Sequence, residues 1–438
     1  MPPTIAYDLT RLLRGLYSST PNGIDRVDLC YARHYLGAPR PDRTAIILNG
    51  WRPWRLEPDA AAAALARIEA HWQESASTEE DAAFHAARNA ILGSTAGPQR
   101  VLSQRPGPLR NTGALTKLLL PLLKNLLFPA PPQNGVFFHT TQFPFASMFR
   151  WLEPRPGMKA VFFIHDLLPQ KFPEFFTLKQ KDWHRRALEI LARHGSGAIV
   201  NGLEVKNDLQ NFLTKKSRPD LPILVAPIPA DPTFSEPSAP DPDLAARPYF
   251  VICGTIEPRK NHLLLLNLWR DLVRQEGPHA PKLVIIGKRG WKNEKILDLL
   301  ERDTTILSHV VEISGLSTPA MKHFVAHARA LLVPSFAEGY CLPMVEALAL
   351  GTPIIASDIA VFREIGKQRC AYQNPTDSQG WLDAIRTFST RPAATQRTAE
   401  KNTWPEYFAR VDAFIEKLSK QGQGSALDPP GNSFPGPI

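Results

Sequence analysis

The chain has 438 residues, of which 43% are apolar and 9% aromatic, and it carries a formal net charge of +9. This length exceeds one ordinary hydrophobic core, so we expect two domains of about 200 residues each. The four cysteines are scattered without CxxC spacing, which argues against a disulfide scaffold or a cysteine metal site. Runs of about 18 apolar residues and the pattern of a signal peptide are both missing, so we expect a cytoplasmic protein.

The excess of positive charge lies in the N-terminal half. Residues 1–230 contain 28 Lys and Arg against 19 Asp and Glu, whereas residues 231–438 contain 23 of each. Residues 100–130 contain no acidic residue and include the leucine-rich segment 115–128. That segment is suited to lie on an anionic membrane surface, which would make the protein peripheral at the inner face of the plasma membrane. The alternative is a core helix with its two lysines on the solvent side.

In the first half, short β-rich apolar runs alternate with amphipathic stretches, which predicts a parallel sheet flanked by helices. We expect one Rossmann-like domain over residues 1–226, with a helical insertion over residues 52–135. Its expected strands are Thr4–Tyr7, Thr44–Leu48, Val136–His139, Ala160–His165, Ala198–Asn201 and Ile223–Ala226. Its expected helices are Asp25–Tyr35, Asp59–Ser75, Thr78–Leu92 and Leu178–Arg193.

Seven prolines between residues 227 and 248 predict a linker. Its Asp241-Pro-Asp243 triplet has the letters of a DxD metal motif, but proline-rich linkers produce such triplets by chance. Residues 249–403 are expected to form a second doubly wound domain of five βα units. Its expected strands are Tyr249–Cys253, Lys282–Gly287, Val310–Ser314, Ala330–Pro334 and Pro353–Ala356. Its expected helices are Asn261–Arg274, Asn293–Glu301, Thr318–His327, Pro343–Leu350 and Gln379–Phe388.

The C-terminal residues divide into two parts. Residues 404–421 are expected to form a helix that crosses back onto the first domain, where Trp404 and Tyr407 would serve as packing residues. Residues 422–438 are poor in large apolar side chains and are expected to be a disordered tail.

Ligands of a doubly wound sheet bind where loops leave the carboxyl ends of its strands. The loop Gly254–Asn261 is the first of these in the second domain, and it places Arg259 and Lys260 at the start of a helix. Unpaired N–H groups at a helix start already favour an anion, and two cations beside them predict a negatively charged ligand. The alternative for this loop by itself is a solvated basic turn.

The loop Pro334–Glu346 carries two glutamates, Glu338 and Glu346, around a glycine turn that enters a helix. Gly339 allows close approach of the backbone to a ligand, and the following amides point from the positive end of the helix. A carboxylate beside an anion-binding helix start would repel the anion. Its presence is explained if the carboxylate accepts hydrogen bonds from hydroxyl groups of the same ligand. A sugar nucleotide offers both kinds of group, with its diphosphate for the amides and cations and its sugar and ribose hydroxyls for the two glutamates.

These segments, together with VIIGKRGW and VEISGLS, resemble the GT-B glycosyltransferases of family 4, over residues 249–388 above all. The resemblance implies two facing Rossmann-like domains with an interdomain cleft, and metal-independent transfer with retention of anomeric configuration. It implies that Arg259 and Lys260 stabilise the departing diphosphate, an electrostatic role suited to fixed cations. It implies that Glu338 positions the donor sugar and that Glu346 binds ribose. Cys341 stands where the family usually has glycine, and its side chain is expected to change donor fit.

Two loops of the first half extend the resemblance. Residues 21–26 lead into a helix and resemble the family's GIGR segment near the donor phosphates, with Gly23 as the expected contact. His165 and Asp166 end a buried strand and are expected to orient or deprotonate the acceptor; the alternative is a histidine that caps the strand end. Further candidates are His139 and Glu204. The full set of expected donor-binding residues is Gly23, Gly254, Gly339, Tyr340, Cys341, Leu342 and Glu346.

The sequence therefore predicts a hexosyltransferase without a cofactor, in which a nucleotide sugar is the co-substrate and the acceptor is a glycan or is lipid-linked. The resemblance favours GDP-mannose, because the HD loop and the GTIEPRKN segment look most like those of mannosyltransferases. Alternatives are transfer to a soluble acceptor and a catalytically degenerate scaffold that binds a nucleotide sugar. A nucleic-acid partner is not expected, because leucines rather than aromatic residues accompany the basic ones.

Overall fold

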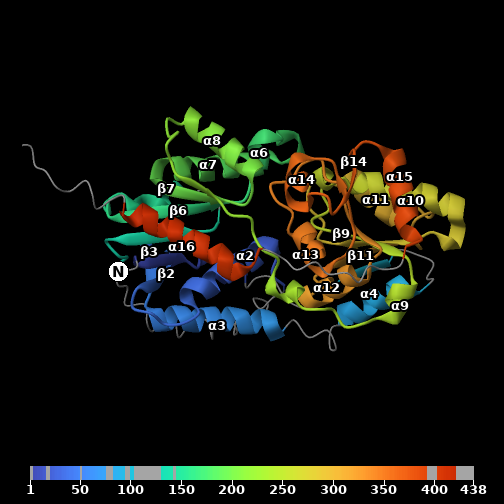
Figure 1. Ribbon diagram of the computed structural model, residues 1–438, viewed down its shortest axis with the longest axis horizontal. Helices are drawn as coiled ribbons and strands as arrows, with labels where there is room; N and C mark the ends of the chain where they lie inside the picture. Colours follow the sequence, from blue (N-terminus) through green and yellow to red (C-terminus); the bar gives the residue numbers. More distant parts are fainter. Residues whose placement is uncertain are drawn as a thin grey trace, which may run out of the picture.

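The protein is described from a computed structural model, which covers residues 3–15, 20–49, 52–74, 82–93, 99–102, 130–141, 145–391 and 402–420. Figure 1 shows two lobes side by side, each built around one sheet. The predicted membrane-surface segment 115–128 and the predicted tail 422–438 lie outside the described residues. Among the described helices, none is long and apolar enough to cross a membrane.

The first domain contains a seven-stranded sheet in the order β3-β2-β1-β5-β6-β7-β8. All neighbouring pairs are parallel except β2 and β3, which pair antiparallel. The strands are β1 (Ile5–Asp8), β2 (Arg43–Asn49), β3 (Arg52–Leu56), β5 (Gly135–His139), β6 (Met158–Ile164), β7 (Gly195–Val200) and β8 (Ile223–Val225). The helices of this domain are α1 (Thr10–Gly15), α2 (Gly23–Leu36), α3 (Pro58–Glu74), α6 (Leu168–Lys171), α7 (Leu178–His194) and α8 (Leu203–Lys215).

The second domain contains another seven-stranded sheet, in the order β14-β13-β12-β9-β10-β11-β4, and all its pairs are parallel. Its strands are β9 (Tyr249–Cys253), β10 (Lys282–Ile286), β11 (Val310–Ser314), β12 (Ala330–Val333), β13 (Ile354–Ser357), β14 (Ala371–Gln373) and β4 (Gln99–Leu102). The helices around it are α10 (His262–Glu276), α11 (Glu294–Arg302), α12 (Thr318–His327), α13 (Leu342–Leu350), α14 (Ala360–Gly366) and α15 (Ser378–Ser389). The predicted fold class, with two facing Rossmann-like domains, is confirmed.

Residues 82–102 differ from the prediction. The sequence analysis included them in an insertion of the first domain, but α4 (Ala82–Leu92) and β4 belong to the second. β4 extends the sheet beside β11, where it satisfies backbone groups that an edge strand leaves unpaired. Helix α4 packs one apolar face into the second core, and Figure 1 shows it in the right-hand lobe beside α9 (Pro242–Ala246). The buried side chains of that face are Ala83, Phe84, Ala87 and Ile91.

Charged groups fasten this segment to the linker and to the second sheet. Arg88 donates from Nε and Nη2 to the carboxylate of Asp241, at 2.7 and 2.9 Å, and from Nη2 to Asp243 at 2.6 Å. Asp241 also accepts from the backbone N–H of Leu244 and caps α9. The two carboxylates of the DxD-like triplet are thus engaged with an arginine. Lys282 donates to the backbone oxygen of Ala90 at 2.6 Å.

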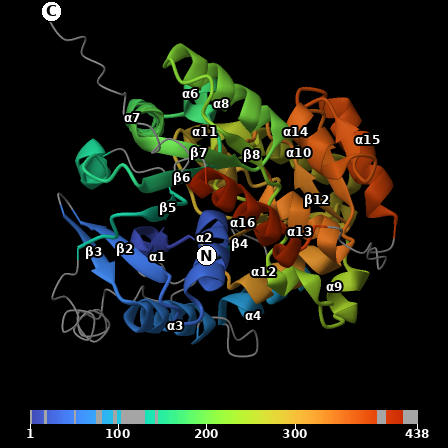
Figure 2. The same cartoon turned by 60° about the vertical axis from the view of Figure 1, so that its left-hand side comes forward.

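Helix α16 (Trp404–Lys420) follows the second domain in sequence and packs in the core of the first (Figure 2). The side chains that it buries there are Tyr407, Phe408, Val411, Ile415 and Leu418. Trp404 donates from its indole N–H to the backbone oxygen of Ala230, 2.8 Å away. The chain therefore passes between the domains four times: between α3 and α4, between β4 and β5, at the linker, and before α16.

Replacing Phe84 by alanine is expected to destabilise the protein by about 3–5 kcal/mol, because the ring is 8% exposed and packs in the core of the second domain. Chemical denaturation of the full chain measures this change. The control is Asn89→Ala on the exposed side of α4, for which a change within about 0.5 kcal/mol is expected. Equal stability of the Phe84 variant and the wild type would contradict the placement of α4.

Candidate active site

A cavity of about 600 Å³ lies between the two domains. Its walls are loops and helix starts that follow the carboxyl ends of strands in both sheets, where doubly wound folds bind ligands. Most of the predicted site residues are brought together in this lining, namely Gly23, His165, Asp166, Gly254, Arg259, Lys260, Glu338, Gly339, Tyr340 and Leu342. Cys341 and Glu346 do not line it.

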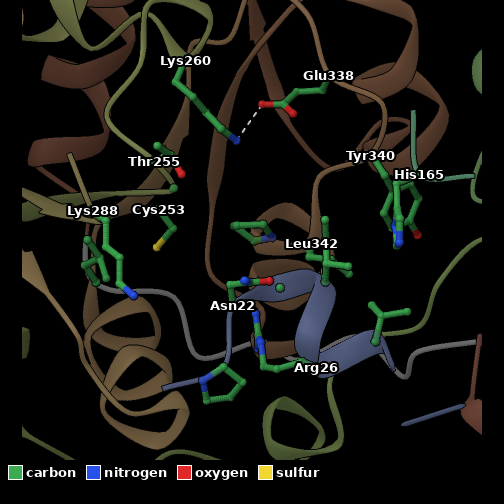
Figure 3. Close-up of a pocket in the computed structure, with 18 of the residues that line it drawn as sticks. Asn22, Arg26, His165, Cys253, Thr255, Lys260, Lys288, Glu338, Tyr340 and Leu342 are labelled. Carbon is green, nitrogen blue, oxygen red and sulfur yellow. Dashed lines mark ion pairs between the residues drawn. The ribbon is translucent and has the colours of Figure 1, made fainter. Parts of the chain in front are cut away.

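The carboxylate of Glu338 joins the two predicted cations. Its Oε2 lies 2.6 Å from Nη1 of Arg259, and its Oε1 lies 2.7 Å from Nζ of Lys260 (Figure 3). The hydroxyl of Ser335 also donates to Oε1, at 2.9 Å. Burial acts to raise the pKa of Glu338, but the two cations outweigh it and leave that pKa below its ordinary value. Glu338 is therefore an anion that fixes both cations at the cavity wall.

Arg259 and Lys260 are held differently. The Arg259 guanidinium is 8% exposed, and it also contacts Glu257 at 2.5 Å and donates to the backbone oxygen of Ala337 at 2.6 Å. Lys260 folds over Gly254, so that a Cβ at Gly254 would lie 3.0 Å from Cε of Lys260. Gly254 also has a φ of +139°, a backbone conformation that residues other than glycine rarely adopt. This glycine therefore makes room for the lysine at the end of β9.

Helix α13 begins at the cavity with Leu342. The first N–H groups of a helix have no partner within the helix, so this end favours an anion. The preceding Cys341 points away from the cavity. Its thiol is 2% exposed in the core of the second domain, and burial raises its pKa to about 12. The expectation that this side chain changes donor fit is therefore not supported by its position, and only its backbone lies at the turn.

Gly339 sets how closely the domains approach. A Cβ on Gly339 would lie 2.3 Å from Cβ of Asp166 and 2.8 Å from the backbone oxygen of His165. Any larger residue at position 339 would push the domains apart at this point. Asp166 itself accepts from the backbone N–H of Leu168 at 3.0 Å and so orders the start of α6.

The loop before α2 is ordered by a reciprocal cap. The Asn22 side chain accepts from the backbone N–H of Asp25 at 3.1 Å, and Asp25 accepts from the N–H of Asn22 at 3.0 Å. Arg11 donates to Asp25 at 2.8 Å. Asp25 thus stands in the GIGR-like segment as a capping residue. The cap places Gly23 at the cavity wall. A Cβ added at Gly23 would lie 3.1 Å from Cδ1 of Leu342, so a larger residue here would crowd the start of α13.

Glu346 is paired across the domain interface. Its Oε1 lies 2.7 Å from Nη2 of Arg26 on α2, and a second carboxylate, Asp231, lies 3.8 Å from Nη1 of Arg26. Glu346 is 1% exposed, and burial raises its pKa to about 7 despite the opposing charge of Arg26. Arg26 lines the cavity, whereas Glu346 lies behind it. The predicted contact between Glu346 and ribose stays a prediction.

His165 follows β6 and is neutral. Its Nε2 donates to the backbone oxygen of Thr140 at 3.0 Å, and its own backbone oxygen accepts from Asn201 at 3.0 Å. Burial, followed by the charge of Arg11, lowers the pKa of His165 to about 4. With Nε2 engaged, Nδ1 is the nitrogen that can accept from a ligand hydroxyl.

The two further candidates of the first domain are engaged elsewhere. His139 is 1% exposed, and its Nδ1 lies 2.6 Å from Asp8 in the core beneath the cleft. Glu204 accepts from Lys171 at 2.8 Å. Neither side chain lines the cavity.

Sequence reasoning did not single out several charged or aromatic lining residues, among them Arg11, Arg26, Glu257, Lys288 and Trp291. Arg26, Lys288 and Trp291 lie within segments already quoted for the resemblance. Of these, Lys288 follows the end of β10 closely, and that position could have revealed it. Figure 3 shows Lys260 and Glu338 across the cavity from Asn22 and Arg26, with Lys288 to one side. The described lining contains five Lys and Arg side chains and three carboxylates, and Asp25 and Glu346 pair with Arg11 and Arg26 from outside the lining. The cations of the cavity wall are therefore held in place by carboxylates on both sides of the cleft.

Comparison with protein families gives a match to the model described as glycosyl transferases group 1, over residues 241–403. The second domain is a glycosyl transferases group 1 domain. The matched range contains the Arg259-Lys260 loop and the Glu338 loop, so the group 1 domain contributes both sets of charged groups to the cavity.

Curated relatives that resemble this chain include two bacterial mannosyltransferases. The serotype-specific mannosyltransferase WbdA of Escherichia coli is 30% identical over 233 residues, which cover 49% of this chain and 28% of WbdA. The O-antigen chain mannosyltransferase RfbU of Salmonella typhimurium is 26% identical over 255 residues, covering 57% of this chain and 64% of RfbU. The chain therefore spans less than a third of WbdA and less than two thirds of RfbU.

Solved structures show the same fold over nearly the whole chain. The Escherichia coli structure titled trehalose-6-phosphate bound with UDP-2-fluoro glucose matches with a TM-score of 0.52 at 14% identity, covering 95% of each chain. Anabaena HepE in complex with UDP matches with a TM-score of 0.50 at 15% identity, covering 96% of this chain and 98% of HepE. The GT-B fold is thus shared by both domains and not only by the group 1 domain.

Replacing Arg26 by alanine is expected to destabilise the protein by about 3–5 kcal/mol, because Glu346 then stays buried without its partner. The loss should grow from pH 6 to pH 9. Burial raises the pKa of Glu346 to about 7 while Arg26 is present, and removal of Arg26 is expected to raise this pKa further. A group with a raised pKa loses its stabilising contribution as pH rises through that pKa, so the variant continues to lose stability at pH values where the wild type no longer does. Denaturant unfolding at several pH values measures both effects.

The double variant Arg26→Met/Glu346→Gln removes both charges and is expected to recover much of the loss and most of its pH dependence. An Arg26→Ala variant with wild-type stability at pH 9 would contradict the ion pair.

Proposed function

We propose that this protein is a retaining, metal-independent glycosyltransferase of family 4 that transfers mannose from GDP-mannose to a polysaccharide or lipid-linked acceptor. The observation that carries the proposal is the shared carboxylate of Glu338, which fixes Arg259 and Lys260 in a cavity between two Rossmann-like domains. The group 1 domain supports the reaction class. The names of WbdA and RfbU support mannose.

The chemistry requires cleavage of the bond between the anomeric carbon and the diphosphate. Negative charge grows on the leaving phosphate in the transition state, so preorganised cations and N–H groups beside it lower the barrier. Arg259, Lys260 and the start of α13 supply these groups on one side of the cavity, and the loop at Gly23 closes the other. The five Lys and Arg side chains supply the positive charge that a metal provides in other transferases.

His165 is suited to orient the acceptor hydroxyl. A neutral imidazole with a pKa of about 4 accepts a hydrogen bond well but does not retain a proton at neutral pH. The proton of the acceptor hydroxyl is therefore expected to pass to an oxygen of the departing phosphate. The carboxylate of Glu338 has acceptor lone pairs that Arg259 and Lys260 do not use. With these it would accept hydrogen bonds from hydroxyl groups of the donor sugar.

Two other functions predict different behaviour. Transfer to a soluble acceptor would need no membrane affinity, whereas the lipid-linked function places the protein at the inner face of the plasma membrane through residues 100–130. A degenerate scaffold would bind the donor without turnover. The complete set of Arg259, Lys260 and Glu338 in one cavity favours an enzyme over such a scaffold.

The first test is slow hydrolysis of GDP-mannose, UDP-glucose, UDP-galactose, UDP-N-acetylglucosamine and dTDP-rhamnose in the absence of acceptor. We expect GDP-mannose to be hydrolysed, and we expect Lys260→Ala and Glu338→Ala to reduce its turnover by about 10²–10³-fold, the usual cost of removing a group that stabilises developing charge. Lys295→Ala, on the exposed face of α11, is the control and should retain full turnover.

Hydrolysis of another donor in place of GDP-mannose would overturn the mannose assignment. Absence of hydrolysis and of thermal stabilisation with every donor would favour the degenerate scaffold.

Retention and metal independence have a separate test. The first-formed anomer of the released sugar, followed by proton NMR, is expected to be α, as in the donor. Turnover is expected to be unchanged after treatment with EDTA, because fixed side chains carry the positive charge. A β anomer or activity that returns only with added Mg²⁺ or Mn²⁺ would contradict the respective part of the proposal.

A further inference from the structure

Exposed aromatic side chains gather on the first domain beside the cleft. Trp183 of α7 is 37% exposed and Phe145 is 45% exposed. Their rings meet edge to face, with centroids 5.4 Å apart. Leu178, at the start of α7, is 81% exposed. Single exposed apolar residues need no explanation, but a contiguous group of them indicates a binding surface.

Trp183 borders a second cavity, of about 320 Å³. Its wall combines flat apolar side chains with hydrogen-bonding groups, namely Pro169, Phe176, Lys179, Gln180, Trp183 and His184. At about 30 Å³ per water molecule this volume corresponds to roughly ten waters. One hexopyranose displaces fewer waters than that, because its bonded heavy atoms pack more closely than separate molecules, so one sugar unit fits. A sugar ring has apolar C–H faces and a polar edge, which this combination of side chains complements.

The second cavity is connected to the interdomain cavity through α6 and α7. Pro169 in its wall directly follows Leu168, which lines the interdomain cavity. The ring of His184 donates from Nε2 to the backbone oxygen of Asp166, 2.9 Å away. Because Asp166 lines the interdomain cavity, one hydrogen bond links the walls of the two cavities.

Aromatic rings continue from one cavity to the other. Phe176 lines the second cavity, and its ring centroid lies 6.1 Å from that of Trp291, which lines the interdomain cavity. Trp291 donates from its indole N–H to the backbone oxygen of Phe175 at 2.8 Å. Phe175 in turn stacks on Phe336, two residues before Glu338, with centroids 5.9 Å apart. A glycan that reaches the reaction centre along this side would pass over these rings.

On the basis of the proposed function, we propose that the second cavity is an acceptor subsite that binds a hexopyranose one or more units away from the reacting hydroxyl. Trp183 and Phe176 would cover the C–H faces of the ring, and Lys179 would bind its hydroxyls. We favour a glycan over a lipid chain because the aromatic side chains of this wall continue to the interdomain cavity, where the acceptor hydroxyl would react.

The test measures binding of methyl α-mannoside, α-linked mannobiose, α-linked mannotriose and maltotriose to the full chain by saturation-transfer NMR and calorimetry. Wild-type affinity is expected to rise with the length of the mannose oligomers. Trp183→Ala should weaken mannotriose binding roughly 10-fold, equivalent to about 1.4 kcal/mol, and reduce the gain in affinity from methyl α-mannoside to mannotriose. Trp183→Phe should restore most of the affinity because it keeps an aromatic face.

Leu203→Ala is the matched control, since Leu203 on α8 is 55% exposed and lines neither cavity. GDP-mannose hydrolysis without acceptor should be the same in all these variants. Equal mannotriose binding by wild type and Trp183→Ala, or no oligosaccharide binding by the wild type, would overturn the subsite. Trp183-dependent binding of vesicles that contain a polyprenyl phosphate, without glycan binding, would identify a lipid site instead. Failure of donor hydrolysis in the wild type would count against the proposed function itself.

Discussion

The interdomain cavity depends on a balance of buried charge. Arg259 could not remain 8% exposed without an anion close by, and Glu338 could not remain ionised there without cations. Each therefore accounts for the burial of the other, and Lys260 and Ser335 complete the group. Because protein side chains alone hold this group together, the positive charge is fixed in position, and little reorganisation is needed when negative charge develops opposite it.

A second buried pair joins the two domains behind the cavity. Arg26 comes from the first domain and Glu346 from the second, so their contact exists only while the domains lie together. Gly339 permits that approach by leaving space for Asp166. A ligand hydroxyl that binds the carboxylate of Glu346 would have to displace Arg26 from it. A ligand that stays within the cavity would instead contact Arg26 in the wall. Arg26 therefore belongs both to the contact between the domains and to the cavity wall.

Much of the second domain could be predicted from sequence, because its strands are short apolar runs and its helices are strongly periodic. Strands such as Tyr249–Cys253 and helices such as Thr318–His327 were expected with the bounds that the structure shows. Short elements with weak patterns, such as β3 and β14, escaped prediction. The strand β4 also escaped prediction. A four-residue segment carries little sequence signal, and none that indicates which of two sheets it joins.

The site was predictable where residue type and backbone context agreed, as for Arg259, Lys260 and Glu338. It was less predictable where a side chain's direction decides the outcome. Cys341 and Glu346 belong to the right loop, but the turn directs one thiol and one carboxylate into the protein interior. Arg26 is the converse case, because its partner lies 320 residues away in the chain and only the assembled domains bring the two together.

The position of α4 and β4 also affects how the protein is made. These elements leave the ribosome early, but β11, on which β4 pairs, begins at Val310, roughly 200 residues later. At a synthesis rate of about 5–20 residues per second, some 10–40 s pass between the synthesis of α4 and that of the strand beside β4. The apolar face of α4 cannot be buried in its core before then. During that interval the nascent chain carries a helix and an edge strand without their partners, which are natural binding sites for a chaperone. The second domain can fold only after its own sequence has been completed around a segment synthesised long before it.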